Sequence, residues 1–234
     1  VLPNGLTTVV VPRPGFTKKL AYFVTDFGSI HTDFRLESTE YHVPAGIAHY
    51  LEHKLFDMPG GRDISEEFAS LGAIVNAFTS YDMTAYYFTC TENFEKNSTL
   101  LLEFVSTPYF PEDSVLREMG IIDQEIGMNA DTPDTRIFES LTEAMFREHP
   151  IRVPILGWRT SISQITPKVL EDCHRAFYRP GNMLLCVVGD VDPDAVAAMA
   201  REVLGDERKP AGIKQPIPEQ AMDCPESRVA TRME

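Results

Sequence analysis

The chain has 234 residues, of which 43% are hydrophobic and 24% charged, a balance typical of a folded globular protein and too apolar for global disorder. Its 35 acidic residues outnumber its 21 basic residues and give a formal net charge of -14, a field that repels phosphate backbones, so nucleic acid is not an expected partner. Uninterrupted apolar stretches such as residues 183–188 are far shorter than the roughly 20 residues that span a bilayer, so no membrane helix is predicted.

The N-terminal part is predicted to form strands around one longer helix. Two β-branched segments at residues 6–11 and 20–26 are expected as strands that the turn at Pro14 and Gly15 joins in a hairpin. The hydrophobic period then becomes helical over residues 44–58. The elements expected next are a short helix at residues 65–71 and strands at residues 73–80 and 84–91.

Helices dominate the rest of the chain. Their apolar residues recur at spacings of three and four, and prolines separate them. The expected helices span residues 94–106, 111–129, 133–148, 166–178 and 193–204, with a buried strand at residues 183–188. This order favours an α+β fold, with a mainly antiparallel sheet and helices packed on one face.

One domain is predicted over residues 1–205. The following segment loses its periodicity and gains prolines, so residues 206–234 are predicted as a linker or tail.

The cysteines and the N-terminus predict a cytoplasmic location. No two cysteines form a CxxC pair, a pattern typical of buried, reduced thiols. The first residues also lack the basic and apolar regions of a secretory signal.

The segment GIAHYLEHKLF contains the strongest chemical pattern. His49 and His53 are four residues apart, and Glu52 lies between them. On a helix such histidines share a face and can bind one cation, while a carboxylate beside them can accept a proton from water that a zinc ion acidifies. A solvated helix face that carries two histidines is the alternative, and the glutamate favours the metal site.

The helix expected at residues 111–129 offers a third ligand. Glu118 and Glu125 are seven residues apart and therefore share a helix face, beside an apolar stripe. Carboxylates of this kind are more often solubilising residues, so both readings stay open on the spacing alone.

The combined pattern resembles the pitrilysin/insulinase family of zinc metallopeptidases, whose inverted zincin motif is HxxEH. The similarity covers nearly the whole chain and indicates the N-terminal catalytic half of a bacterial member. The matching segments are the opening NGLT, the HxxEH helix, the strand VNAFTS, the acidic helix, PILGW and FYRPGNMLLCVVGDVDP.

This resemblance implies a set of site residues. It implies that His49, His53 and Glu125 bind Zn2+. Glu52 is then the catalytic base, and Glu118 is a second catalytic carboxylate that supports the ligands. The implied function is hydrolysis of peptides by a metal-activated water.

The resemblance also implies partners. An edge strand containing Asn76, Ala77 and Phe78 is expected to pair with the backbone of a peptide substrate. Full members contain two homologous halves, so a second half or a partner subunit is expected, and a homodimer is a further arrangement. The alternative function is a non-catalytic peptide-binding or scaffold subunit that assembles with a partner.

Overall fold

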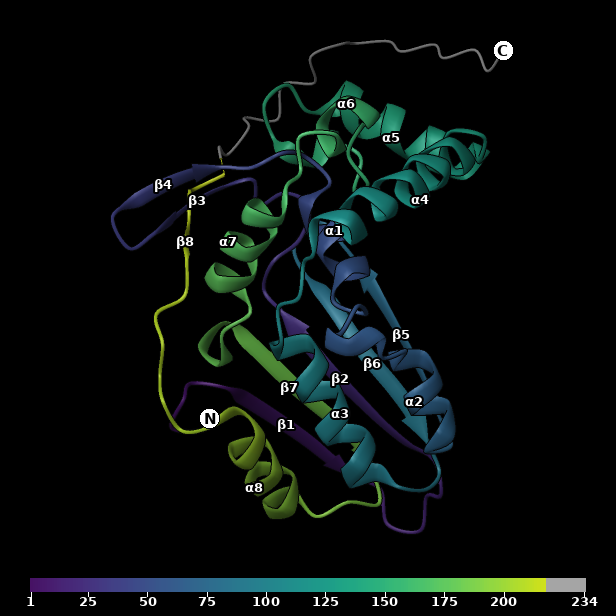
Figure 1. Ribbon diagram of the computed structural model, residues 1–234, viewed down its shortest axis with the longest axis vertical. Coiled ribbons are helices and arrows are strands. Elements are labelled where there is room, and N and C mark those ends of the chain that lie inside the picture. The colour runs from purple at the N-terminus through teal and green to yellow at the C-terminus, as the bar shows by residue number, and fades with distance from the viewer. Residues whose placement is uncertain (218–234) are drawn as a thin grey trace.

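A computed structural model describes residues 1–217 of the chain (Figure 1). The α-helices are α1 (Ile47–Lys54), α2 (Ile64–Ser70), α3 (Phe94–Ser106), α4 (Glu112–Ala130), α5 (Pro133–Met145), α6 (Arg159–Ile162), α7 (Pro167–Phe177) and α8 (Pro193–Leu204). The strands are β1 (Thr7–Pro12), β2 (Lys19–Thr25), β3 (Asp33–Leu36), β4 (Thr39–His42), β5 (Ala73–Thr79), β6 (Thr84–Cys90), β7 (Met183–Gly189) and β8 (Ile213–Lys214).

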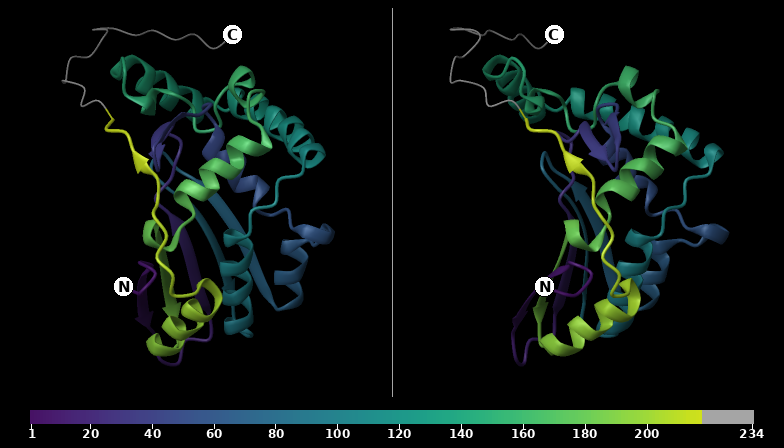
Figure 2. Two further views of the ribbon diagram at one scale, coloured as in Figure 1. Left: turned by 60° about the vertical axis from the view of Figure 1, so that its left-hand side comes forward. Right: turned by 90° about the vertical axis from the view of Figure 1, so that its left-hand side faces the viewer.

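The larger sheet has the strand order β1-β7-β2-β6-β5. Only β1 and β7 pair in parallel, and the other neighbours are antiparallel. The helices lie on one face of this sheet (Figure 2). The predicted α+β fold is therefore confirmed, and within the described part of the chain β5 forms a free edge.

The hydrophobic core lies between that sheet face and the helices. The strands alternate as a half-buried sheet should, and Phe23, Phe88 and Leu185 point into the core with no exposed surface. Leu101 and Phe104 of α3 fill the same layer. Among the described residues, no helix is both long and apolar enough to cross a bilayer.

The predicted hairpin of the first two strands is wrong. β7 lies between β1 and β2, so Thr7 pairs with Leu184 in parallel and Thr25 pairs with Met183 in antiparallel register. The turn at Pro14 and Gly15 therefore joins strands that are not neighbours. A local turn signal gives no information about a strand that enters from the far end of the chain.

The helix predicted over residues 44–58 is shorter. Gly46 adopts a left-handed conformation with φ +89 immediately before α1, so a right-handed helix cannot extend back to Pro44. After Lys54 the chain turns and forms an isolated bridge between Asp57 and Asp63. The small sheet of β4, β3 and β8 was not predicted.

The start of the predicted tail packs on the domain. β8 pairs with β3, and Lys214 Nζ lies 2.5 Å from Asp26 Oδ1. Residues 218–234 lie outside the described residues, and the domain boundary at residue 205 stays a prediction. Cys90 and Cys173 are buried and Cys186 is half-buried, all as free thiols, whereas Cys224 also falls outside the described part.

Candidate metal centre

Helix α1 divides into a packing face and a chemical face. Ile47 and Leu51 are fully buried in the core. His49 and Glu52 lie on the other side and are also largely buried, with 6% and 8% of their surfaces exposed. The imidazole of His53 is more open, at 25%. The motif is thus largely buried and does not form a solvated helix face.

Helix α4 runs beside α1 and brings both predicted carboxylates to the histidines (Figure 1). Glu125 Oε2 lies 3.6 Å from Nε2 of His49 and 3.6 Å from Nε2 of His53. The ligand atoms of these three residues all lie within 4.8 Å of one another, which makes a cluster that could hold a metal ion.

The two separations that involve Glu125 fit a small cation. Two ligands bound tetrahedrally at 2.0–2.1 Å are roughly 3.4 Å apart. The 3.6 Å separations are close to that value and longer than an ordinary N–H···O hydrogen bond. Two imidazole nitrogens and one carboxylate oxygen are also a donor set that zinc accepts, with a fourth position left open.

Glu118 lies behind His53. Its Oε1 is 2.9 Å from His53 Nδ1, the ring nitrogen that does not face Glu125. A carboxylate in this position fixes the orientation of the ring and makes the opposite nitrogen a better ligand. The two carboxylates of α4 therefore occupy different positions relative to the histidine.

The charges of these groups shift each other's pKa values. Burial disfavours the charged His53 ring, but the hydrogen bond with Glu118 and the nearby carboxylates outweigh burial and raise the pKa of His53. The adjacent His49 ring, with His53, holds the pKa of Glu125 below its ordinary value against the effect of burial. The cluster thus attracts positive charge.

Glu52 is held from the sheet. The hydroxyl of Thr79, the last residue of β5, donates a 2.8 Å hydrogen bond to Glu52 Oε2. Thr79 was not identified from the sequence. Strand alternation would place it on the same face as Ala77, but nothing local indicates that this face meets α1.

Polar contacts that the sequence did not reveal fix α4 relative to α1. The fully buried Lys54 Nζ donates to Ser114 Oγ at 2.6 Å and pairs with Asp57. The Tyr50 hydroxyl donates to the backbone oxygen of Val115, and burial raises the pKa of Tyr50 to about 12. These bonds hold the first turn of the helix that carries both glutamates.

The three predicted substrate-binding residues lie on the free edge strand. Exposure alternates along β5, so Asn76 and Phe78 lie on the sheet face opposite the helices, and Phe78 is 40% exposed. Ala77 lies on the side of Thr79 and Glu52. Its N–H is directed away from β6 and donates to the Asn76 side chain at 2.8 Å.

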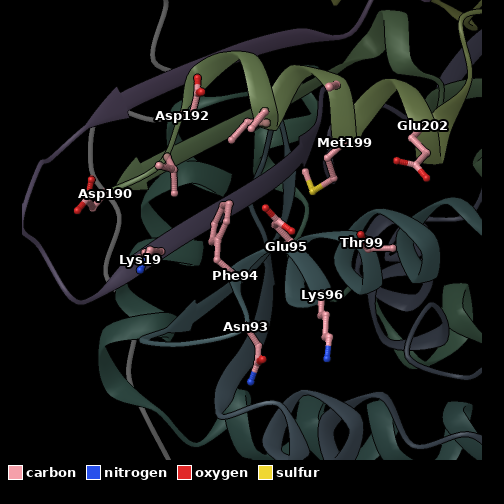
Figure 3. Close-up of a pocket in the computed structure, with 14 residues that line it drawn as sticks. Lys19, Asn93, Phe94, Glu95, Lys96, Thr99, Asp190, Asp192, Met199 and Glu202 are labelled. Carbon is pink, nitrogen blue, oxygen red and sulfur yellow. The ribbon is translucent and has the colours of Figure 1, made fainter.

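A groove of about 780 Å³ lies elsewhere, between α3 and α8 (Figure 3). It is lined by Lys19 and Asn93, at the end of the sheet away from Thr79, and by the apolar side chains of Phe94 and Met199. None of the predicted site residues lines it, so it is separate from the metal cluster.

Comparison with known proteins gives the family. The model described as "Insulinase (Peptidase family M16)" matches residues 37–158, just over half of the chain. The chain belongs to this family. A second model, "Peptidase M16 inactive domain", matches residues 164–232.

Individual relatives agree with this assignment. The chain is 48% identical to YmfH, named as a zinc protease of Bacillus subtilis, over 87% of its own length and 48% of that protein. It is 31% identical to a protein named as a zinc protease of Rickettsia felis, over 86% of the chain and 48% of the relative. An M16-like peptidase from Alicyclobacillus acidocaldarius superposes with a TM-score of 0.88 at 40% identity, covering 93% of this chain and 52% of that one.

The family identified from the sequence is thus confirmed. The chain spans about half the length of the curated relatives that it matches.

Proposed function

We propose that this chain is the metal-binding half of a zinc metallopeptidase that hydrolyses peptide bonds. The observation that carries the proposal is the convergence of His49, His53 and Glu125 beside a buried glutamate, Glu52. His49, His53 and Glu125 would hold the zinc ion. When bound, zinc supplies Lewis acidity, which polarises a carbonyl and makes water a stronger acid.

The remaining chemistry belongs to the side chains. Glu52 accepts a proton from the attacking water as the water oxygen bonds to the scissile carbonyl carbon. It then donates that proton to the amine nitrogen as the carbon–nitrogen bond breaks. Glu118 holds the His53 ring through its Nδ1.

The free edge of β5 supports a binding mode for an extended peptide. An edge strand offers unpaired N–H and C=O groups, and backbone pairing gives affinity that depends little on the side chains of the ligand. We assign this contact to the stretch Asn76, Ala77 and Phe78. Because the Asn76 side chain occupies the N–H of Ala77, it must turn away when a peptide backbone takes that position.

A homologous second half is the proposed partner, since the relatives are about twice as long as this chain. The cytoplasmic location remains a prediction from the sequence.

Metal analysis tests the ligand set. The purified chain is expected to bind about one zinc ion, and Glu125→Gln to weaken binding because an anionic ligand is lost. A matched control is Glu95→Gln, on α3 beside the distant groove. Zinc that binds equally tightly to the Glu125 variant would remove Glu125 from the ligand set.

Glu52→Gln distinguishes an enzyme from a binding subunit. Glutamine keeps the size of the side chain but cannot accept the proton, so zinc binding should persist while hydrolysis by the chain with its second half falls roughly 10²–10⁴-fold. A peptide library incubated with the zinc-loaded assembly measures this rate. If the parent assembly cleaves no peptide, the non-catalytic binding or scaffold function replaces the enzyme.

A further inference from the structure

Thr79 connects the sheet to the proposed base. It is the last residue of β5, and its hydroxyl reaches Glu52 on α1 at 2.8 Å. Glu52 has only 8% of its surface exposed, and within the described part of the chain this is the hydrogen bond that its carboxylate receives. A bond to a buried carboxylate is among the stronger hydrogen bonds of a protein.

The direction of this bond follows from the neighbouring threonine. Thr84 is paired with Thr79 across β5 and β6, and its hydroxyl lies 2.9 Å from the backbone oxygen of Phe27. Each hydroxyl has one proton, so Thr84 donates to Phe27. The longer 3.4 Å contact between the two threonine hydroxyls leaves the proton of Thr79 for Glu52.

We infer that Thr79 is a positioning residue that fixes the carboxylate of Glu52. A glutamate side chain has three rotatable bonds, whereas β-branched threonine has a restricted χ1, so the donor is more rigid than the group it holds. The bond occupies Oε2 and leaves Oε1 available for a water molecule. The catalytic consequence rests on the proposed function.

The position of Thr79 in the sheet gives this bond a second consequence. It follows Ala77 and Phe78 on the strand proposed to receive the peptide backbone. One rigid strand therefore fixes both the register of the peptide and the carboxylate of the base. This arrangement keeps the position of the substrate relative to the base nearly constant. Reaction rates are sensitive to small errors in that position.

Paired substitutions test the inference. Thr79→Val removes the hydroxyl at nearly constant shape, and Thr79→Ser keeps it. Thr89→Val, on β6 and half-exposed, is a matched control elsewhere in the same sheet. The first readout needs neither metal nor substrate: the 13C NMR signal of the Glu52 carboxyl carbon in the metal-free chain, identified by its loss in Glu52→Gln.

The expected results separate positioning from general damage. Thr79→Val should move the Glu52 signal, Thr79→Ser should restore it, and Thr89→Val should leave it unchanged. In the zinc-loaded assembly with its second half, Thr79→Val should lower kcat roughly 10-fold or more, with KM and zinc affinity nearly constant. It should add no further loss in the Glu52→Gln background, because both changes act through one carboxylate.

Other outcomes overturn the inference. An unmoved Glu52 signal in Thr79→Val, or a loss of zinc affinity that parallels the loss of rate, would make Thr79 a structural residue only. If the parent assembly cleaves no peptide, the proposed function fails, and the NMR comparison still decides whether Thr79 orients Glu52.

Discussion

Two histidines of this fold are mostly removed from water, yet their surroundings shift their pKa values in opposite directions. His53 meets the carboxylate of Glu118, and its pKa is raised. His174 is enclosed by the rings of Phe110 and Tyr178, and its Nε2 faces the backbone oxygen of Val105. Burial lowers the pKa of His174 to about 4. Burial therefore decides the preferred charge state of His174, whereas at His53 the carboxylates outweigh burial.

The lowered pKa of His174 predicts that the folded chain loses stability in acid. The unfolded chain protonates this ring near its ordinary value of 6.5, whereas the folded chain keeps it neutral down to about 4. The unfolded state therefore binds more protons in this window, and the free energy of unfolding should fall as pH falls through it, by on the order of 3 kcal/mol. His174→Gln removes this titration and should show a smaller loss.

Urea unfolding of the metal-free parent and variant across that pH range measures the difference in slope. Glutamine can still donate a hydrogen bond to Val105. The comparison uses the slope of the free energy of unfolding against pH and does not depend on the absolute stabilities. Parallel curves for the two proteins would mean that His174 does not titrate on unfolding in this window.

At the scale of elements, the short helix α1 owes its position to a close backbone contact at its N-terminus. Gly46 has φ +89, and a Cβ added there would lie 2.4 Å from the backbone oxygen of Leu156. On the opposing loop, Gly157 approaches Ala45 equally closely. The Ser161 hydroxyl also donates to the Ala45 oxygen at 2.8 Å. This loop therefore sets where the helix that carries His49 and His53 begins.

Gly46→Ala should disturb both stability and metal binding. Alanine in the left-handed region costs about 1–2 kcal/mol, and here the methyl group also forces a shift of backbone that cannot rotate away. Gly15→Ala is a matched control, because Gly15 has φ +80 but no atom lies within 4 Å of an added Cβ. Urea unfolding and competition with a zinc chelator should show a larger loss for Gly46→Ala than for Gly15→Ala in both measurements. Equal losses would exclude the contact with Leu156 as the cause.

Local signals in the sequence predicted most of the elements. The helices at residues 94–106 and 193–204 have the predicted bounds, because apolar periodicity and terminal residues mark both ends. The order of the strands could not be predicted, since β7 joins the sheet between β1 and β2 from far along the chain. β3 and β4 have four residues each: the alternation of Phe34 and Leu36 in β3 is too short to indicate a strand, and β4 is mostly exposed.

In the candidate site, too, features with a local sequence signal could be predicted and contacts between distant segments could not. Helical spacing predicted that His49 and His53 share a face, and that Glu118 and Glu125 share another. The meeting of the two faces was expected only through the family resemblance, because spacing within a helix says nothing about which helix lies opposite. The contact of Thr79 with Glu52 joins a strand to a helix and has no local signal.

At the scale of the whole molecule, no helix among residues 1–217 covers one side of the larger sheet (Figure 2). Val9, Ile74 and Phe78 lie on that side and are 42%, 76% and 40% exposed. The metal cluster is also open, since Glu125 has 36% of its side chain exposed. The chain spans about half the length of its relatives, and the proposed second half would supply further contacts to a substrate.

We therefore expect the activity to depend on the second half. An exposed site that holds a peptide by one strand only also admits bulk water, so the chain alone should cleave unfolded peptides slowly. Adding the separately produced second half of the longer polypeptide should raise kcat/KM by roughly 10²-fold, which a fluorogenic peptide assay measures. The same mixture made with Glu52→Gln controls for activity brought by the added half, and should stay at the background rate. If the chain alone is as active as the mixture, the zinc ligands, Glu52 and the edge of β5 suffice to position a peptide, and the second half has another task.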